Sequence, residues 1–324
     1  MILVTGATGF LGSEVAKQLA LRGNHVRCTK RSTSKIPILL TQFSENIEWV
    51  EADLMDIFSL GEALDGVKQV YNCAAWVSLK QADKEAMINA NITGTGNLVN
   101  LCLLNNIRLV HVSSVAAIGQ AKPGELTTEK HHLDQATEHD GYAISKLESE
   151  MEVWRGIAEG LDAVIVNPSI IIGANAGTEG SGALFETVRK GLKFYTSGSM
   201  GFVDVTDVAK SMIALMNSNI QAERFIISAE NRNYKELTSE IANNFGIKPP
   251  AILAKPWMME IVWRGAALAA FITRGAPAID KVSAQAASNV KNFDNSKIKE
   301  ATGIEFKPLS ESIKEVCAAL SHQN

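Results

Sequence analysis

The sequence predicts an α/β fold in which a doubly wound parallel sheet is joined to a smaller, mostly helical C-terminal domain. Three observations lead to this prediction. Short apolar runs alternate with helical patterns up to Pro168, glycines mark the first strand–helix junction, and the pattern becomes mostly helical after about residue 230. Strand–helix alternation favours one parallel sheet with right-handed crossovers. A chain of 324 residues is long enough for two such units.

The first two-thirds of the chain contain short β-like segments bounded by turn residues or helical patterns. The predicted strands cover residues 2–5, 25–31, 48–52, 67–74, 108–113 and 163–167. Between them, one predicted helix ends at Leu21, and three more cover residues 58–64, 84–105 and 142–159. Each strand is thus followed by a segment long enough to cross over the sheet.

The pattern changes beyond Pro168. The glycine-rich stretch 173–182 has no clear period and predicts a loop. Residues 202–217 indicate a strand end entering a helix, and 223–228 a seventh strand, so the chain returns to the main sheet here. Further helices are predicted at 235–245, 257–273, 296–302 and 310–320.

Composition excludes several classes of protein. The 31 basic and 35 acidic residues give a net charge of −4, which argues against a nucleic-acid partner. The four cysteines share no C-x-x-C spacing, so we expect reduced thiols rather than disulfides or a zinc site. The polar stretch 131–139 contains three histidines, and we interpret it as a solvated loop rather than a metal site.

The same sequence lacks the usual signals for export or membrane insertion. The N-terminus has no basic segment and no long apolar run, so no signal peptide is predicted. The longest apolar stretch, 257–273, is interrupted by Glu260 and Arg264, so no membrane span is predicted. It is interpreted as a core helix, with a cover over an apolar substrate and weak membrane association as alternatives. We expect a cytoplasmic protein.

A glycine-rich turn lies between the first predicted strand and the first predicted helix. Small residues there allow the backbone to approach a pyrophosphate, which the N–H groups of the helix N-terminus then bind. The predicted phosphate-binding residues are Gly6, Thr8, Gly9, Phe10, Leu11 and Gly12. The position of this turn in an alternating α/β pattern makes the prediction specific.

The end of the second strand indicates which dinucleotide is bound. NAD-binding units usually place an acidic residue there for the ribose 2′-hydroxyl. No Asp or Glu occurs from Val15 to Ser44, whereas Arg31 ends the strand and Lys35 follows it. A guanidinium binds a 2′-phosphate in bidentate fashion. The sequence therefore predicts NADP(H), with solvated surface charges as the alternative interpretation of these residues.

Tyr142 and Lys146 have the spacing i, i+4 at the start of a predicted helix, which places them on one helix face. An ammonium group beside a phenol favours the phenolate, so the pair can exchange a proton near neutral pH. The fifth strand ends in Val112-Ser113-Ser114, and either serine could supply a hydroxyl beside this pair.

These motifs together resemble the extended branch of the short-chain dehydrogenase/reductase superfamily, the NAD-dependent epimerase/dehydratase family. The resemblance covers residues 1 to about 230 and is closest to dihydroflavonol-4-reductase-like and 3β-hydroxysteroid dehydrogenase-like members. It rests on T-G-A-T-G-F-L-G at 5–12, N-x-x-G-T-x-N from Asn91, Y-x-x-x-K from Tyr142, N-P-S from Asn167 and F-V-D-V-x-D-V-A from Phe202. It implies a Rossmann-type sheet.

The resemblance also implies roles for individual residues. It favours Ser114 over Ser113 as the group that polarises a substrate carbonyl, and it places Asn91 behind the catalytic groups. The catalytic set is then Ser114, Tyr142, Lys146 and Asn91. The cofactor contacts it implies, beyond those above, are Asp53, Leu54, Ala74, Ala75, Tyr142, Lys146, Pro168 and Ser169.

The leading hypothesis is an NADP(H)-dependent reductase of an aldehyde or ketone on a small, apolar substrate. The alternatives are a sugar-nucleotide epimerase or dehydratase using the same site, and a non-catalytic NADP-binding regulator. Residues 1–168 and about 200–230 are predicted to bind NADP, and residues 169–199 and 231–324 the substrate. The predicted helices at 84–105 and 142–159 form a dimer face in many extended members, so the resemblance suggests a homodimer.

Overall fold

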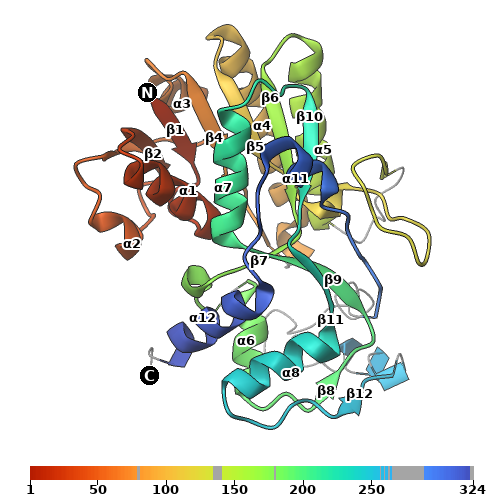
Figure 1. The fold of residues 1–324 in the computed structure, drawn as a ribbon. Coiled ribbons are helices and arrows are strands. Elements are labelled where there is room, and N and C mark those ends of the chain that lie inside the picture. Colours follow the sequence, from red (N-terminus) through yellow and green to blue (C-terminus); the bar gives the residue numbers. More distant parts are fainter. Residues whose placement is uncertain are drawn as a thin grey trace.

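The computed structural model describes residues 1–78, 81–133, 141–178, 180–255, 257–258, 260–261, 263–264 and 288–321. A seven-stranded parallel sheet forms its centre, with the strand order β10-β6-β5-β4-β1-β2-β3 (Figure 1). The strands are β1 (Ile2–Thr5), β2 (Val26–Lys30), β3 (Ile47–Glu51), β4 (Gln69–Asn72), β5 (Arg108–Val112), β6 (Ala163–Pro168) and β10 (Glu223–Ile227). The predicted α/β fold with a doubly wound parallel sheet is confirmed.

The central strands are apolar on both sides because helices cover both faces of the sheet. On one face, Val4 and Val110 pack against α1 (Phe10–Leu21) and α7 (Val205–Met216). On the other, Leu3 and Leu109 pack against α3 (Ile57–Ala63), α4 (Lys84–Leu104) and α5 (Gly141–Ala158). Alternate residues of each strand therefore belong to different cores.

The strand order reverses direction between β1 and β4. From β1 the chain proceeds to β2 and β3 on one side, whereas β4, β5 and β6 follow on the other. The first crossover helices diverge at this point, and a crevice forms beyond the carboxyl ends of the strands. The fold thus places a ligand site above β1 and β4.

A second region occupies the lower half of Figure 1. It contains a three-stranded sheet of β11 (Glu230–Asn233), β9 (Ser199–Asp204) and β7 (Ile170–Ile172), and a pair formed by β8 (Phe194–Tyr195) and β12 (Ile252–Leu253). Helices α6 (Gly182–Arg189), α8 (Tyr234–Asn244) and α12 (Leu309–Ser321) pack with the larger of these sheets around a separate apolar core.

Shorter helical elements complete the described chain. They are α2 (Ile38–Thr41), α11 (Ser296–Thr302) and the 3-10 turns η1 (Gln81–Asp83), η2 (Val115–Ala117) and η3 (Ala174–Ala176). No helix within the described ranges has the length and apolar character needed to cross a bilayer.

The second region differs from the prediction in two places. The stretch 173–182, predicted as a loop, contains η3 and the first residue of α6. The chain does return to the main sheet after residue 200, through α7 and β10, but β9 pairs with β7 and β11 instead. Most of the predicted helix at 257–273 lies outside the described residues.

Candidate active site

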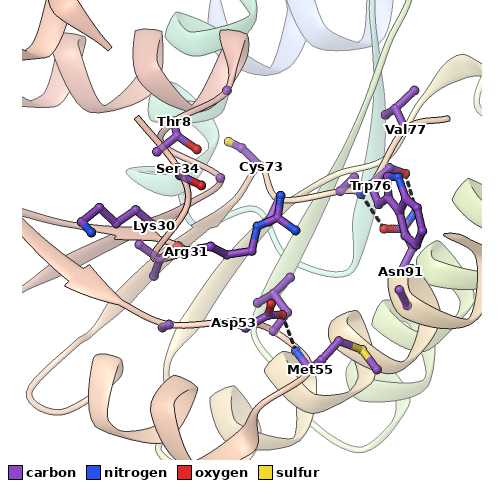
Figure 2. A pocket seen from close by; sticks show the side chains of 18 residues that line it. Thr8, Lys30, Arg31, Ser34, Asp53, Met55, Cys73, Trp76, Val77 and Asn91 are labelled. Atoms are coloured by element: carbon purple, nitrogen blue, oxygen red, sulfur yellow. Dashed lines mark hydrogen bonds between the residues drawn. The ribbon is translucent and has the colours of Figure 1, made fainter. Parts of the chain in front are cut away.

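A pocket of about 540 Å³ opens above the carboxyl ends of β1, β2, β3 and β4 (Figure 2). Its lining comes from four strand ends and from α4. The lining residues are Gly6, Thr8, Gly9, Thr29, Lys30, Arg31, Ser34, Ala52, Asp53, Leu54, Met55, Cys73, Ala74, Ala75, Trp76, Val77, Ala90 and Asn91. Half of the predicted site residues therefore meet in one crevice, at the reversal of strand order.

The glycine turn has no room for side chains. Gly6 has φ +65°, and a Cβ there would lie 2.7 Å from the backbone nitrogen of Ala74. A Cβ at Gly12 would collide with the Gly6 carbonyl oxygen. Gly9 begins α1 without a side-chain cap, so the first N–H groups of the helix remain available to a ligand. This arrangement fits the pyrophosphate of a dinucleotide.

The next residues of the motif position the turn rather than line the pocket. Leu11 and Gly12 are buried, and Leu11 packs in the core beneath α1. Phe10 is half-buried and lies close to Gly173, where an added Cβ would come within 3.1 Å of its ring. The first strand–helix unit is thereby fixed against the start of the second region.

Two basic side chains, Lys30 at the end of β2 and Arg31 directly after it, line one end of the pocket. Figure 2 shows Arg31 extending toward the middle of the pocket, whereas Lys30 points in the opposite direction. Ser34 also lines this end, and its N–H donates to the Arg31 carbonyl oxygen at 2.9 Å. Lys35 is exposed and lies outside the lining.

The loop after β3 is held in place by its own side chain and by α4. Asp53 Oδ1 accepts from the backbone N–H of Met55 at 3.0 Å. Asn97 on α4 donates to the Leu54 carbonyl oxygen at 2.9 Å. A Cβ at Gly94 would lie 2.9 Å from Leu54 Cβ, so α4 approaches this loop closely. The residues of the N-x-x-G-T-x-N pattern therefore position the Asp53–Leu54 loop, which lines the pocket.

Asn91 joins three parts of the site. Its Oδ1 accepts from the Trp76 N–H at 2.7 Å, and its Nδ2 donates to the Trp76 carbonyl oxygen at 2.8 Å. The same Nδ2 donates to Ser145 Oγ on α5 at 2.7 Å. Asn91 therefore fastens the loop after β4 to the helix that carries Tyr142 and Lys146.

Tyr142 lies half-buried in the first turn of α5, and Lys146 follows one turn later on the buried face. Lys146 Nζ donates to the Val112 carbonyl oxygen at the end of β5, at 3.1 Å. Burial lowers the pKa of Lys146 to about 8, although Cys73 and Glu150 act in the opposite direction. Its ammonium therefore approaches titration in the physiological range.

Ser114 and Ser113 differ in their hydrogen bonding. Ser114 is 8% exposed, and its Oγ accepts from the Ala116 N–H at 3.1 Å, which leaves the hydroxyl hydrogen available. Ser113 is 3% exposed, and its Oγ has no partner within the part of the chain that the structure describes. Neither serine lines the pocket itself.

Pro168 and Ser169 lie at the end of β6, away from the pocket's lining. Pro168 pairs with Ile227 of β10. Ser169 is buried, and its backbone N–H donates to the Ile227 carbonyl oxygen at 3.0 Å. These residues connect β6 to β10 where the chain leaves the main sheet.

The sequence prediction missed a buried ionic cluster behind Lys146. Glu150 is 1% exposed and pairs with Arg224 of β10 at 3.0 Å. Asn167 donates to the second carboxylate oxygen of Glu150 at 2.7 Å and to the Ser114 carbonyl oxygen at 3.0 Å. The one available signal was that Glu150 shares a helix face with Tyr142 and Lys146.

Within the described ranges, no group of three or more His, Cys, Asp or Glu side chains is placed to hold a metal ion. Asp134 and His139, part of the histidine-containing stretch, lie outside the described residues.

Comparison with known proteins assigns the chain to a family. The model of the NAD dependent epimerase/dehydratase family matches residues 2–228. The chain belongs to this family. The resemblance predicted from the motifs is therefore confirmed, and the chain is an enzyme of a family of nicotinamide-dependent oxidoreductases, epimerases and dehydratases.

Similar proteins match over most of the chain. A Synechocystis protein named as a dihydroflavonol 4-reductase is 28% identical over 98% of this chain and 93% of its own length. Sterol demethylase protein B of Methylococcus capsulatus is 28% identical over 80% of this chain and 78% of its own length. The crystal structure of gox2253 superposes with a TM-score of 0.85 and 28% identity, covering 100% of this chain and 98% of that one.

Proposed function

We propose that this family member is an NADP(H)-dependent reductase, which transfers a hydride to the carbonyl of an aldehyde or ketone on a small, apolar substrate. The observation that carries the proposal is the layout of the pocket. Arg31 enters it at one end, and the Asn91–Trp76 contact joins its other end to α5. Residues 1–168 and about 200–230 bind the cofactor in this proposal, and residues 169–199 and 231–324 the substrate.

Arg31 supports NADP(H) over NAD(H). Its guanidinium extends into the pocket, and Asp53, the acidic side chain in the described lining, already accepts from the Met55 N–H (Figure 2). We expect Arg31→Ala to weaken NADPH binding by about 10- to 100-fold, the effect of losing a charge-assisted hydrogen bond. NADH binding should change little.

Binding of both cofactors is measured by fluorescence titration. Lys30→Ala is the matched control, because its side chain points the other way (Figure 2). Equal losses of NADPH and NADH affinity in Arg31→Ala would remove this residue from the 2′-phosphate site.

The side chains of α5 supply the acid–base chemistry in this proposal. A bound nicotinamide supplies the hydride. Tyr142 donates a proton to the carbonyl oxygen, and the buried Lys146 ammonium stabilises the phenolate that remains. Ser114 keeps its hydroxyl hydrogen for the developing oxyanion, because its oxygen already accepts from the Ala116 N–H.

The apolar character of the substrate is supported by the rim of the pocket. Trp76 is 43% exposed and Val77 60% exposed, and both line the end nearest Asn91. Exposed apolar side chains beside a ligand pocket favour a ligand that covers them. Because Asn91 binds both backbone polar groups of Trp76, this wall is held in one position.

The test is NADPH oxidation across a panel of aldehydes, ketones and nucleotide sugars, with Tyr142→Phe as the comparison. We expect oxidation with apolar carbonyls, and a loss of about 100-fold or more in the variant, which retains NADPH binding. An isomerised or dehydrated nucleotide sugar with retained cofactor would replace this proposal by the epimerase or dehydratase alternative. Turnover that is unchanged in Tyr142→Phe would overturn the acid–base assignment.

A further inference from the structure

A row of buried polar side chains crosses the sheet beneath α5. Thr5 Oγ1 donates to Asn72 Oδ1 at 2.6 Å, and Asn72 Nδ2 lies 3.0 Å from His111 Nδ1. Thr5 Oγ1 also accepts from the Ala74 N–H at 3.3 Å, in the loop that lines the pocket. These side chains stand on adjacent strands at matching register, on the face that α4 and α5 cover.

The direction of these hydrogen bonds fixes the tautomer of His111. Asn72 Oδ1 is taken by the Thr5 hydroxyl, so Asn72 Nδ2 donates to His111 Nδ1. Burial, with a smaller effect of Lys146, lowers the pKa of His111 to about 3, so the ring is neutral. The ring proton is therefore on Nε2. This buried donor has no partner among the described residues.

Three more buried polar atoms, on α5 and at the ends of β5 and β6, also lack partners within the described chain. They are Ser113 Oγ, Ser149 Oγ and Asn167 Oδ1. Ser113 lies two residues after His111, on the same face of β5. Asn167 lies beside Ser113 on β6, as shown by the 2.8 Å bond from the Ser113 N–H to the Val166 carbonyl oxygen. Ser149 precedes Glu150, the partner of Asn167.

Lys146 lies close to His111, whose pKa its charge helps to lower. Its Nζ donates to the carbonyl oxygen of Val112, the residue between His111 and Ser113. This part of the interior therefore contains two kinds of donor, His111 Nε2–H and the ammonium, and acceptors on Asn167 and the serines. A water molecule accepts two hydrogen bonds and donates two, and buried waters bind where polar groups lack protein partners.

We propose that one or two buried water molecules, bound by His111 Nε2, Ser149 Oγ and Asn167 Oδ1, solvate the Lys146 ammonium. His111 is then a positioning residue that acts on Tyr142 through water and Lys146. The inference rests on the proposed function in one respect, since it assigns Lys146 to the acid–base pair. The other groups that act on Lys146 are Cys73, from the loop after β4, and Glu150 of α5, which itself pairs with Arg224 of β10.

Two substitutions separate the two nitrogens of His111. In His111→Asn the amide replaces Nδ1, which keeps the Asn72 contact and removes the donor toward the water. In His111→Gln the longer side chain places its amide near Nε2, which retains that donor. Ser149→Ala removes a ligand of the water without touching Asn72. It keeps the proposal testable if His111→Asn does not fold.

The first measurement follows the titration of Lys146 itself, in protein without cofactor, by NMR of ¹³C-labelled lysine assigned with Lys146→Met. An ammonium that loses a water acceptor is less stable, so its pKa falls. We expect a decrease of about 0.5–1 pH unit in His111→Asn and Ser149→Ala. His111→Gln should retain the wild-type titration. An unchanged titration in His111→Asn and Ser149→Ala would overturn the proposal.

The second measurement is the pH dependence of kcat/KM for alcohol oxidation. With less charge on Lys146, the Tyr142 phenolate is less favoured, so the acid limb should move to higher pH by a similar amount in His111→Asn and Ser149→Ala. NADPH affinity and thermal midpoint identify misfolded variants. If Tyr142→Phe retains full turnover, the proposed function is wrong. The titration of Lys146 is measured without cofactor or substrate, so it still shows whether water binds at this position.

Discussion

Lys146 is the residue at which stability and the proposed activity oppose each other. Its pKa is about 8 in the folded protein, against an ordinary value of 10.5, because burial disfavours the ammonium. Below pH 8 the lysine is charged in both folded and unfolded states, so the full cost of burying the charge is present. Between pH 8 and 10.5 the folded protein loses this proton first, so its stability rises with pH.

Lys146→Met should therefore raise the free energy of unfolding at pH 7 by roughly 2 kcal/mol. The gain should shrink as pH rises through 8 and disappear near 10.5, where wild type no longer carries the charge. Urea unfolding at pH 7 and at pH 10 measures the difference. Lys314→Met on the exposed face of α12 is the control, and a gain equal at both pH values would contradict this account.

For single residues, the sequence predicted which ones line the pocket better than it predicted the hydrogen bonds and ion pairs that hold them in place. Gly6, Arg31 and Asp53 follow strand ends, and strand ends of a parallel sheet converge on one edge. The partners of Asn91 were not predictable, because Trp76 and Ser145 approach it only after three separate elements pack. The Glu150–Arg224 pair was missed for the same reason, since 74 residues separate its members.

Among the elements, α4 determines the position of the loop after β3, which lines the pocket. Gly94 permits this helix to approach the Asp53–Leu54 loop, where an added Cβ would lie 2.9 Å from Leu54 Cβ. Gly94→Ala should therefore push α4 away from the loop, at a cost of about 1–3 kcal/mol in stability. The Asn97 hydrogen bond to Leu54 lengthens with it, so NADPH affinity should fall.

Gly96→Ala provides the matched control in the same helix. The Cβ there would meet Glu152 Oε2 at 3.0 Å, the end of a flexible side chain that can move aside. Both variants gain similar helix propensity relative to glycine, about 1 kcal/mol. Thermal unfolding and NADPH titration of the two proteins distinguish them. Equal behaviour would mean that the close approach at Gly94 does not hold the loop.

The elements that the sequence did not predict share a physical cause. The central strands are continuous apolar runs, because both of their faces are buried, so their pattern is strong. In contrast, β11 has the sequence Glu-Asn-Arg-Asn and β8 and β12 have two residues each. β11 forms because β9 offers it an edge to pair with, and β8 and β12 form because they pair with each other. No local pattern records such pairings.

In the whole molecule, the residues proposed for acid–base chemistry lie at the start of α5, which forms a partly exposed pair with α4. Helices α4 and α5 pack closely on one face of the main sheet, and α5 begins with the residues of the proposed acid–base pair. Met151 on α5 is 52% exposed and Leu104 on α4 is 78% exposed. These observations support the homodimer suggested by the sequence resemblance, which we propose is formed through this face.

A dimer through α4 and α5 makes a specific prediction for Met151→Glu. A carboxylate placed on both sides of a symmetric contact repels itself and loses its hydration, so the variant should elute as a monomer. Its fold should persist, because the side chain is exposed in the single chain. Light scattering after gel filtration measures the mass.

Leu21→Glu, at an exposed position on α1, should leave the wild-type mass unchanged. A wild-type protein that is monomeric at micromolar concentration would exclude this assembly. If Met151→Glu keeps the mass of a wild-type dimer, the dimer must form through another face.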